Sequence, residues 1–168
     1  MCTFNVKEKG LRNLAAWLED TAVTIFLSVP TLFRHFATSL EGAERFTHLR
    51  LVRLGGEEVT PLELRLFQEH FSLSTAFSNG YGATESGFNL ACCIDRNAAV
   101  TGTAVSIGYP FKGMDVYLAD DDGQRLPPGQ TGQIAVQSRY LAEGYWRNEE
   151  ATRKKFLPGP PGSGERIY

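Results

Sequence analysis

Hydrophobic and polar positions along the first half of the chain alternate between helical and strand periodicity. Apolar residues recur every three or four positions over residues 7–19, which predicts an amphipathic helix there despite Gly10. The β-branched apolar run at 22–29 predicts a strand buried on both faces. Pro30 then opens a second helix, which Gly42 is expected to close.

The same rhythm continues to about residue 78. Residues 49–54 read as a strand, and Thr60-Pro61-Leu62-Glu63 is a capping box that predicts a third helix up to about Phe71. A short β-prone run at 74–78 follows. This αβαβαβ order predicts an α/β fold with a parallel sheet, in which ligands gather at the carboxyl ends of the strands.

After about residue 104 the pattern becomes that of antiparallel β structure. Residues 114–119 and 133–137 are strand-like, and residues 158–164 are rich in proline and glycine and predict a loop. Asp120, Asp121 and Asp122 precede a glycine, so a solvated hairpin turn is a simpler interpretation than a metal site. The change of rhythm divides the chain into a lobe at 1–104 and a second part at 105–168.

One polar string combines several kinds of ligand-binding chemistry. Residues 79–86 read Asn-Gly-Tyr-Gly-Ala-Thr-Glu-Ser and are predicted to form a loop after a buried strand. Tyr81 offers a face for a base, Thr84 a donor for a phosphate oxygen, and Glu85 a hard oxygen ligand for Mg²⁺. The two glycines allow the backbone to approach a ligand closely. The alternative interpretation is an ordinary strand-to-loop turn, because asparagine, glycine and serine favour turns in general.

The string resembles the adenine- and Mg-binding motif of the adenylate-forming enzymes, the superfamily of acyl-CoA synthetases, luciferases and adenylation domains of nonribosomal peptide synthetases. Residues 51–57, which end in Gly-Gly-Glu, are similar to a second motif of that superfamily. Residues 132–146 and 165–168 are similar to two later ones. The resemblance implies an α/β lobe with flanking helices, followed by part of a small antiparallel β-barrel subdomain.

The resemblance also implies roles for individual residues. Asn79 would bond the adenine amino group, Tyr81 would stack on the ring, Thr84 would contact the α-phosphate and Glu85 would help hold Mg²⁺. Gly80 would face the acyl or aminoacyl pocket. The remaining residues expected to contact the nucleotide, mainly through the backbone, are Gly55, Gly56, Glu57 and Gly82; glycines that simply end a strand are the alternative.

The implied reaction uses ATP to convert a small-molecule carboxylate to an acyl-AMP, and then transfers the acyl group to a phosphopantetheine thiol of a carrier protein or of CoA. The superfamily's phosphate loop, its ribose-binding aspartate and its catalytic lysine have no counterpart in these 168 residues. The sequence is therefore expected to be a central fragment, inactive without N- and C-terminal portions. A stand-alone fatty- or aryl-acyl-CoA ligase and a non-catalytic interaction module are the two alternatives.

Composition excludes other classes of protein. A net charge of −2 supplies no basic field for nucleic acid. No apolar run approaches the roughly 18 residues of a membrane span, and the first residues lack a signal peptide's apolar region, so we expect a cytoplasmic protein. Three cysteines are too few for a disulfide framework or a zinc site, and the adjacent pair Cys92 and Cys93 is expected to serve packing.

Overall fold

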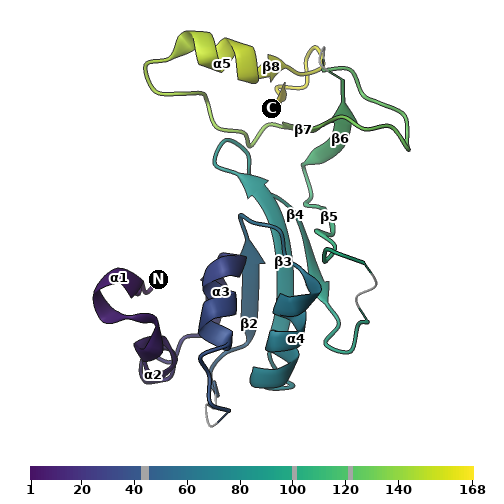
Figure 1. Ribbon diagram of the computed structural model, residues 1–168. Helices are drawn as coiled ribbons and strands as arrows, with labels where there is room; N and C mark the ends of the chain where they lie inside the picture. Colours follow the sequence, from purple (N-terminus) through teal and green to yellow (C-terminus); the bar gives the residue numbers. More distant parts are fainter. Residues whose placement is uncertain (43–45, 100–101, 121–122) are drawn as a thin grey trace. The chain divides into compact units, whose positions relative to one another are not determined.

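The computed structural model describes residues 1–42, 46–99, 102–120 and 123–168 (Figure 1). These residues form two compact units. The first unit contains Met1–Gly80 and Cys92–Gly108, and the second contains Tyr81–Ala91 and Tyr109–Tyr168. The division of the chain at 104/105 stays a prediction.

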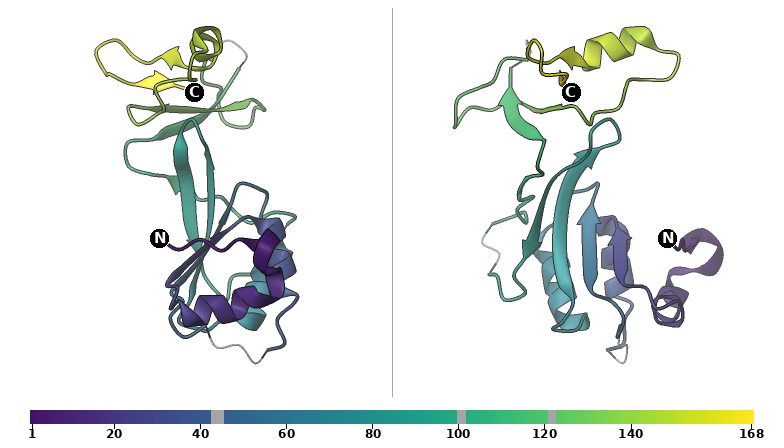
Figure 2. Two further views of the ribbon diagram at one scale, coloured as in Figure 1. Left: turned by 90° about the vertical axis from the view of Figure 1, so that its left-hand side faces the viewer. Right: turned by 180° about the vertical axis from the view of Figure 1, so that it is seen from behind.

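The first unit has the parallel topology that the sequence predicts. Strands β1 (Ile25–Ser28), β2 (Leu51–Gly55) and β3 (Ala76–Ala83) lie in that order, and both pairings are parallel. Helices α3 (Pro30–Ala37) and α4 (Pro61–His70) are the crossovers and lie on one face of the sheet (Figures 1 and 2).

Helix α4 begins at the predicted capping box. The Thr60 hydroxyl accepts a hydrogen bond from the Leu62 N–H at 3.3 Å, while the Glu63 carboxylate accepts one from the Thr60 N–H at 2.8 Å. Two N–H groups that have no partner in the helix are thereby satisfied. Helix α3 also begins at proline as predicted, but it ends at Ala37, before Gly42.

The predicted helix at 7–19 is wrong in its continuity. The structure has α1 (Val6–Lys9), a 3₁₀ turn at Leu11–Asn13 and α2 (Leu14–Asp20) instead of one helix. Gly10 separates them with a φ of 74°, a backbone conformation that no residue inside an α-helix adopts. The apolar spacing survives the break, because Leu14 and Leu18 are both buried.

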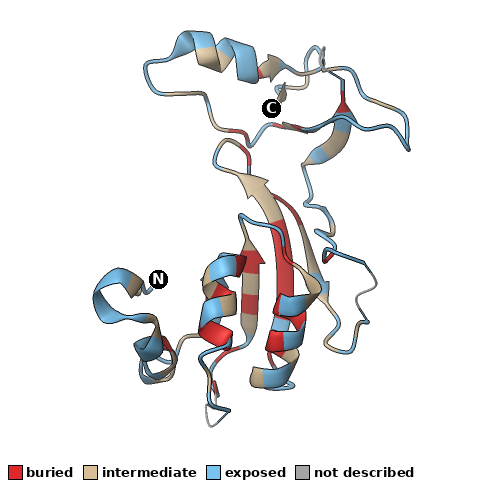
Figure 3. Ribbon diagram, viewed as in Figure 1, coloured by how far each residue is buried: buried red, intermediate tan, exposed pale blue. Residues whose placement is uncertain are grey.

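The core of the first unit lies between the helices and one face of the sheet (Figure 3). Phe33 of α3 and Phe67 of α4 both pack on Phe77 of β3, with ring centroids 6.5 Å and 4.9 Å apart. All three side chains are fully buried. Aromatic side chains of this size contribute much of a small core's burial energy.

The expectation that residues 22–29 are buried on both faces is wrong. Phe26 faces the core, but Ile25 and Leu27 are 49% and 58% exposed. Successive side chains of a strand point to opposite faces, and α3 and α4 cover only one of them. Cys93 is likewise exposed rather than packed, whereas the half-buried Cys92 thiol donates to the Ser106 carbonyl at 3.0 Å.

Strands β3 and β4 (Gly87–Ile94) are joined by a three-residue turn and have residues in both units. In the second unit, β4 pairs antiparallel with β5 (Tyr109–Pro110), the last strand of the five-stranded sheet. The predicted antiparallel strands are present as β6 (Asp115–Ala119) and β7 (Gln133–Ser138). They form a second sheet in the order β6-β7-β9-β8, with β8 at Leu157–Pro158 and β9 at Arg166–Ile167.

Helix α5 (Glu149–Lys155) was not predicted. Asn148 caps it by accepting the Ala151 N–H at 3.0 Å, and its charges run from acidic to basic along the helix, which suits the helix dipole. Two residues of the predicted aspartate turn, Asp121 and Asp122, lie outside the described residues. Throughout the described ranges, no helix is both long and apolar enough to cross a membrane.

Candidate functional site

Two of the four recognised motifs meet on neighbouring strands of the first unit. Gly55 at the end of β2 pairs with Gly80 of β3, and Leu54 pairs with Asn79. The carboxyl ends of neighbouring parallel strands lie at one edge of a sheet, and the register places Gly55 beside Gly80 there.

The predicted loop at 79–86 is wrong in its secondary structure. Asn79 to Ala83 belong to β3, and only Thr84, Glu85 and Ser86 form the turn to β4. The strand continues because β2 pairs with β3 up to Gly80 and β4 follows directly after the turn. Asn89 donates to the buried Ser86 hydroxyl at 2.8 Å, which ties the end of the turn to β4.

Asn79 is held rigidly in the first unit. Its side chain is 2% exposed, and Nδ2 donates to the backbone carbonyls of Val105 and Ser106 at 3.0 Å and 3.1 Å. This use of Nδ2 leaves the amide oxygen Oδ1 as the acceptor. Among the described residues, none donates a hydrogen bond to Oδ1.

Two of the candidate glycines are required by the protein's own backbone. Gly56 adopts a φ of 86°, which favours glycine after β2. A Cβ on Gly82 would lie 2.0 Å from the carbonyl oxygen of Gly87, across the hairpin. At Gly80 a Cβ would lie 2.9 Å from the Arg53 guanidinium. The missing side chain of Gly82 is therefore explained by the hairpin itself, without a ligand.

Glu57 anchors the N-terminus of helix α3. Its Oε2 accepts hydrogen bonds from the Thr31 N–H at 2.9 Å and from the Thr31 hydroxyl at 2.6 Å. The bond from the hydroxyl is the main reason that the pKa of the Glu57 carboxyl is lowered from its ordinary value of 4.5. A carboxylate is also favoured beside the positive end of a helix dipole.

A second carboxylate, that of the capping residue Glu63, also bonds to helix α3. Glu63 was not singled out as a functional residue from the sequence. It is fully buried, and Oε1 accepts from the Arg34 guanidinium at 2.6 Å. Burial alone would raise the pKa of Glu63, but hydrogen bonds from Thr60 and Arg34 outweigh it, and the pKa is lowered. The Arg34–Glu63 pair joins α3 to α4.

In the second unit the Glu85 carboxylate has a specific partner. Its Oε1 accepts a hydrogen bond from the Tyr145 hydroxyl at 2.7 Å, and its backbone carbonyl accepts the Ala142 N–H at 2.7 Å. The bond from Tyr145 is the largest cause of a lowered pKa for Glu85, and the same bond raises the pKa of Tyr145. Tyr168 also lowers the pKa of Glu85. The hydrogen bond from Tyr145 thus favours the charged form of Glu85 and the neutral form of Tyr145.

Tyr81 and Thr84 are available for a ligand. Tyr81 is half-buried and Thr84 is exposed. Neither side chain forms a hydrogen bond with another described residue, so the phenol of Tyr81 and the hydroxyl of Thr84 are not used to hold the hairpin together. These are the two side chains expected to contact a base and a phosphate.

The side chains present suit a cation whose other ligands are waters and substrate phosphates. No group of three or more acidic, histidine or cysteine side chains gathers in the described part of the chain. Mg²⁺ keeps several waters and is commonly bound through one or two carboxylates plus substrate phosphates. A carboxylate has about four lone-pair positions, so Glu85 can accept from Tyr145 and still ligate a cation. The residues present fit Mg²⁺ bound with a nucleotide.

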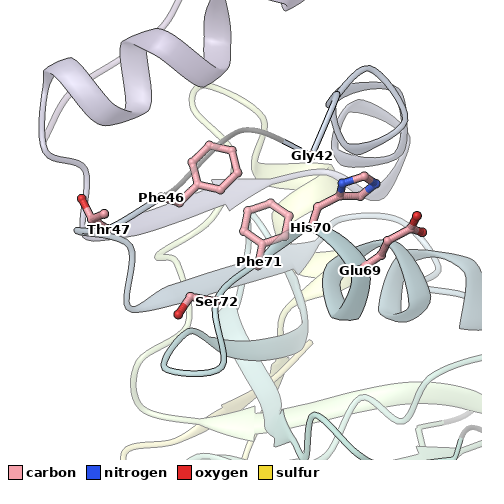
Figure 4. A pocket seen from close by; sticks show the side chains of 7 residues that line it. All are labelled: Gly42, Phe46, Thr47, Glu69, His70, Phe71 and Ser72. Atoms are coloured by element: carbon pink, nitrogen blue, oxygen red, sulfur yellow. The ribbon is translucent and has the colours of Figure 1, made fainter.

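A pocket in the first unit is separate from these residues. Phe46 and Phe71 stack with centroids 4.9 Å apart, and His70 and Glu69 lie beside them (Figure 4). Its lining comes from the segment before β2, the last two residues of α4 and the segment after α4, so it lies at the amino ends of β2 and β3, opposite to the carboxyl end where Gly55 lies. The pocket adds no residue to the candidate site.

The family described as AMP-binding enzyme matches residues 2–146. Tyrocidine synthase 2 of Brevibacillus parabrevis is 33% identical over 161 residues, which are 95% of this chain and 4% of that protein. Surfactin synthase subunit 2 of Bacillus subtilis (strain 168) is 32% identical, over 98% of this chain and 4% of the relative. The chain thus spans a small part of these relatives.

The solved structure of the nonribosomal peptide synthetase FmoA3 (S1046A) is similar to this chain with a TM-score of 0.81 and 28% identity, over 94% of this chain and 17% of that one. Its AMPPNP-bound form is similar with a TM-score of 0.79 and 28% identity, over 92% of this chain and 17% of that one. The fold of an α/β unit with a parallel sheet and a unit with an antiparallel sheet is therefore that of a known class of domain.

Proposed function

Since the chain belongs to the family of AMP-binding enzymes, we propose that it supplies part of the ATP site of an adenylate-forming ligase of the peptide-synthetase type. The observation that carries this proposal is how the side chains of the Asn79–Glu85 string are placed and bonded. Its buried asparagine presents an acceptor, its tyrosine and threonine side chains form no hydrogen bond with the described residues, and its carboxylate is oriented by Tyr145.

The adenine side of the proposed site uses Asn79 and Tyr81. Oδ1 of Asn79 is an acceptor of the kind that an adenine amino group requires, and the hydrogen bonds from Nδ2 fix its orientation. Tyr81 supplies a face on which a purine stacks. The backbone of Gly55 and Gly56 borders the base, and Gly80 faces the acyl or aminoacyl pocket. The Glu57 side chain is engaged with Thr31, so Glu57, like Gly82, is proposed to contact the ligand through its backbone.

The phosphate side uses Thr84 and Glu85. The Thr84 hydroxyl donates to an α-phosphate oxygen, and Glu85 binds Mg²⁺. A bound Mg²⁺ supplies electrostatic stabilisation for the charge that develops on the phosphate oxygens when pyrophosphate leaves. Glu85 suits this role because it is a carboxylate at neutral pH and because its hydrogen bond from Tyr145 leaves lone pairs for a cation.

We assign an amino acid as the carboxylate substrate and the phosphopantetheine thiol of a carrier protein as the acceptor. The support is that the relatives are named tyrocidine and surfactin synthases and that the similar structure is a nonribosomal peptide synthetase. In this reaction the carboxylate oxygen bonds to the α-phosphorus and pyrophosphate leaves. The thiolate then displaces AMP to give a thioester.

The test is ATP–pyrophosphate exchange by the natural polypeptide that carries this sequence, assayed with single amino acids and with fatty acids. We expect exchange with one or a few amino acids and none with fatty acids. Glu85→Gln should remove roughly 2–4 kcal/mol of transition-state stabilisation, and the exchange rate should fall accordingly. No ATP binding, or exchange that is unaffected by Glu85→Gln at limiting Mg²⁺, would contradict the proposal.

A further inference from the structure

We propose that Tyr145 is a positioning residue for Glu85, and that its hydroxyl fixes the carboxylate for binding a divalent cation. This inference rests on the proposed function, because it takes Glu85 as the cation ligand. The two residues are 60 positions apart in sequence, yet the Tyr145 hydroxyl lies 2.7 Å from Oε1 of Glu85.

The backbone of Glu85 is held by the same segment that holds its side chain. The Ala142 N–H donates to the Glu85 carbonyl at 2.7 Å, three residues before Tyr145. Glu85 sits in the three-residue turn between β3 and β4, where a glutamate side chain without a partner has several rotamers available. Two hydrogen bonds, one to the backbone and one to the side chain, therefore set both the place and the direction of the carboxylate.

Tyr145 is itself fixed by its surroundings. Its N–H donates to the Thr152 hydroxyl at 2.9 Å, and its ring packs edge-on against buried Phe156 with centroids 5.6 Å apart. Gly144 lets the two segments approach, because a Cβ there would lie 2.4 Å from the Thr152 side chain. A group held in this way can preorganise the residue to which it bonds.

A phenol suits this role for an electrostatic reason. A lysine or arginine in place of Tyr145 would also hold the carboxylate, but its positive charge would oppose the binding of a cation; Lys155 already acts on Glu85 electrostatically, without forming an ion pair with it. The Tyr145 hydroxyl donates one hydrogen bond to Oε1 of Glu85 and adds no positive charge beside it. The hydrogen bond from Tyr145 therefore leaves Glu85 its negative charge and its remaining lone pairs.

The test is a double-mutant cycle of Tyr145→Phe and Glu85→Gln in the natural polypeptide that carries this sequence. Tyr145→Phe removes the hydroxyl and keeps the ring against Phe156. Tyr140→Phe is the matched control, since Tyr140 belongs to the same unit and is 66% exposed. Mn²⁺ binding in the presence of ATP is measured by electron paramagnetic resonance, ATP binding is measured in EDTA, and each melting temperature is recorded.

We expect Tyr145→Phe to weaken Mn²⁺ binding about tenfold, as is typical for residues that orient metal ligands. ATP binding in EDTA should be unchanged, Tyr140→Phe should have no effect, and Tyr145→Phe should have no further effect in the Glu85→Gln background. Unchanged Mn²⁺ affinity in Tyr145→Phe, while Glu85→Gln abolishes it, overturns this inference alone. Unchanged Mn²⁺ affinity in Glu85→Gln overturns the proposed function as well. A variant that fails to fold shows that Tyr145 acts in packing, and this also overturns the inference.

Discussion

The carboxylate of Glu57 accepts two hydrogen bonds from Thr31, one from its N–H and one from its hydroxyl, and thereby connects the loop after β2 to the start of α3. The Gly-Gly-Glu motif thus contains two different kinds of residue. Its glycines are suited to the ligand side of the rim, and its glutamate is engaged with a helix.

Replacing Glu57 by alanine should lower the melting temperature more than it lowers the affinity for ATP. The reason is that both hydrogen bonds at the helix N-terminus are lost, whereas no ligand contact is removed. Thr31→Ala is the matched variant, and the double variant should melt close to the lower of the two single variants. A selective loss of ATP affinity at an unchanged melting temperature would instead assign the Glu57 side chain to the nucleotide.

The hydrogen bonds that the Glu63 carboxylate accepts from Thr60 and Arg34 predict a pH dependence of stability. The pKa of Glu63 is lowered in the folded protein, so its contribution is fully present above its ordinary value of 4.5 and is lost as pH falls through the lowered value. Glu63→Gln should cost about 2 kcal/mol of unfolding free energy at pH 7, less than the roughly 3–5 kcal/mol of a fully buried pair, because Arg34 is partly exposed.

Chemical denaturation from pH 7 to pH 3 checks this prediction. The natural sequence should lose stability on the acid side, and Glu63→Gln should show a flatter curve over the same range. Glu58→Gln is a suitable control, because Glu58 is exposed and lies outside the ion pair. Parallel curves for the natural sequence and Glu63→Gln would contradict the assignment.

Gly82→Ala should destabilise the β3–β4 hairpin. The new Cβ would lie 2.0 Å from the Gly87 carbonyl, so the backbone has to move, at a cost of roughly 1–3 kcal/mol or more. Ala83→Ser, at the next position of the same strand, is the control. Chemical denaturation measures both, and an unchanged stability for Gly82→Ala would show that the hairpin is not as tight as described.

Local sequence signals predicted the elements that are determined locally. Thr60 and Glu63 form the cap of α4 within four residues, and Pro30 begins α3, so both helix starts could be predicted. The order of helices and strands then predicted the parallel sheet, and ligand-binding segments at the carboxyl ends of its strands follow from that topology. Helix α5 had a usable signal in Asn148 followed by acidic and then basic residues, and that signal was missed.

Features that depend on distant segments could not be predicted in this way. The exposure of Leu27 depends on which face the helices cover, and periodicity does not report this. Asn79 is extended because β3 pairs with β2, although the asparagine and glycines of this string favour a loop. The bond between Glu85 and Tyr145 joins residues 60 positions apart, so no local pattern contains it.

The affinity of Tyr81 variants for ATP tests the central claim most directly. Stacking of a base on an aromatic ring contributes roughly 1–3 kcal/mol, so Tyr81→Ala in the natural polypeptide should weaken ATP binding by about ten- to a hundredfold, and Tyr81→Phe should largely restore it. Titration calorimetry gives the affinity, and a thermal melt of each variant separates binding from folding. If Tyr81→Ala melts early but binds ATP normally where it is folded, Tyr81 is a packing residue and the proposed nucleotide site is contradicted.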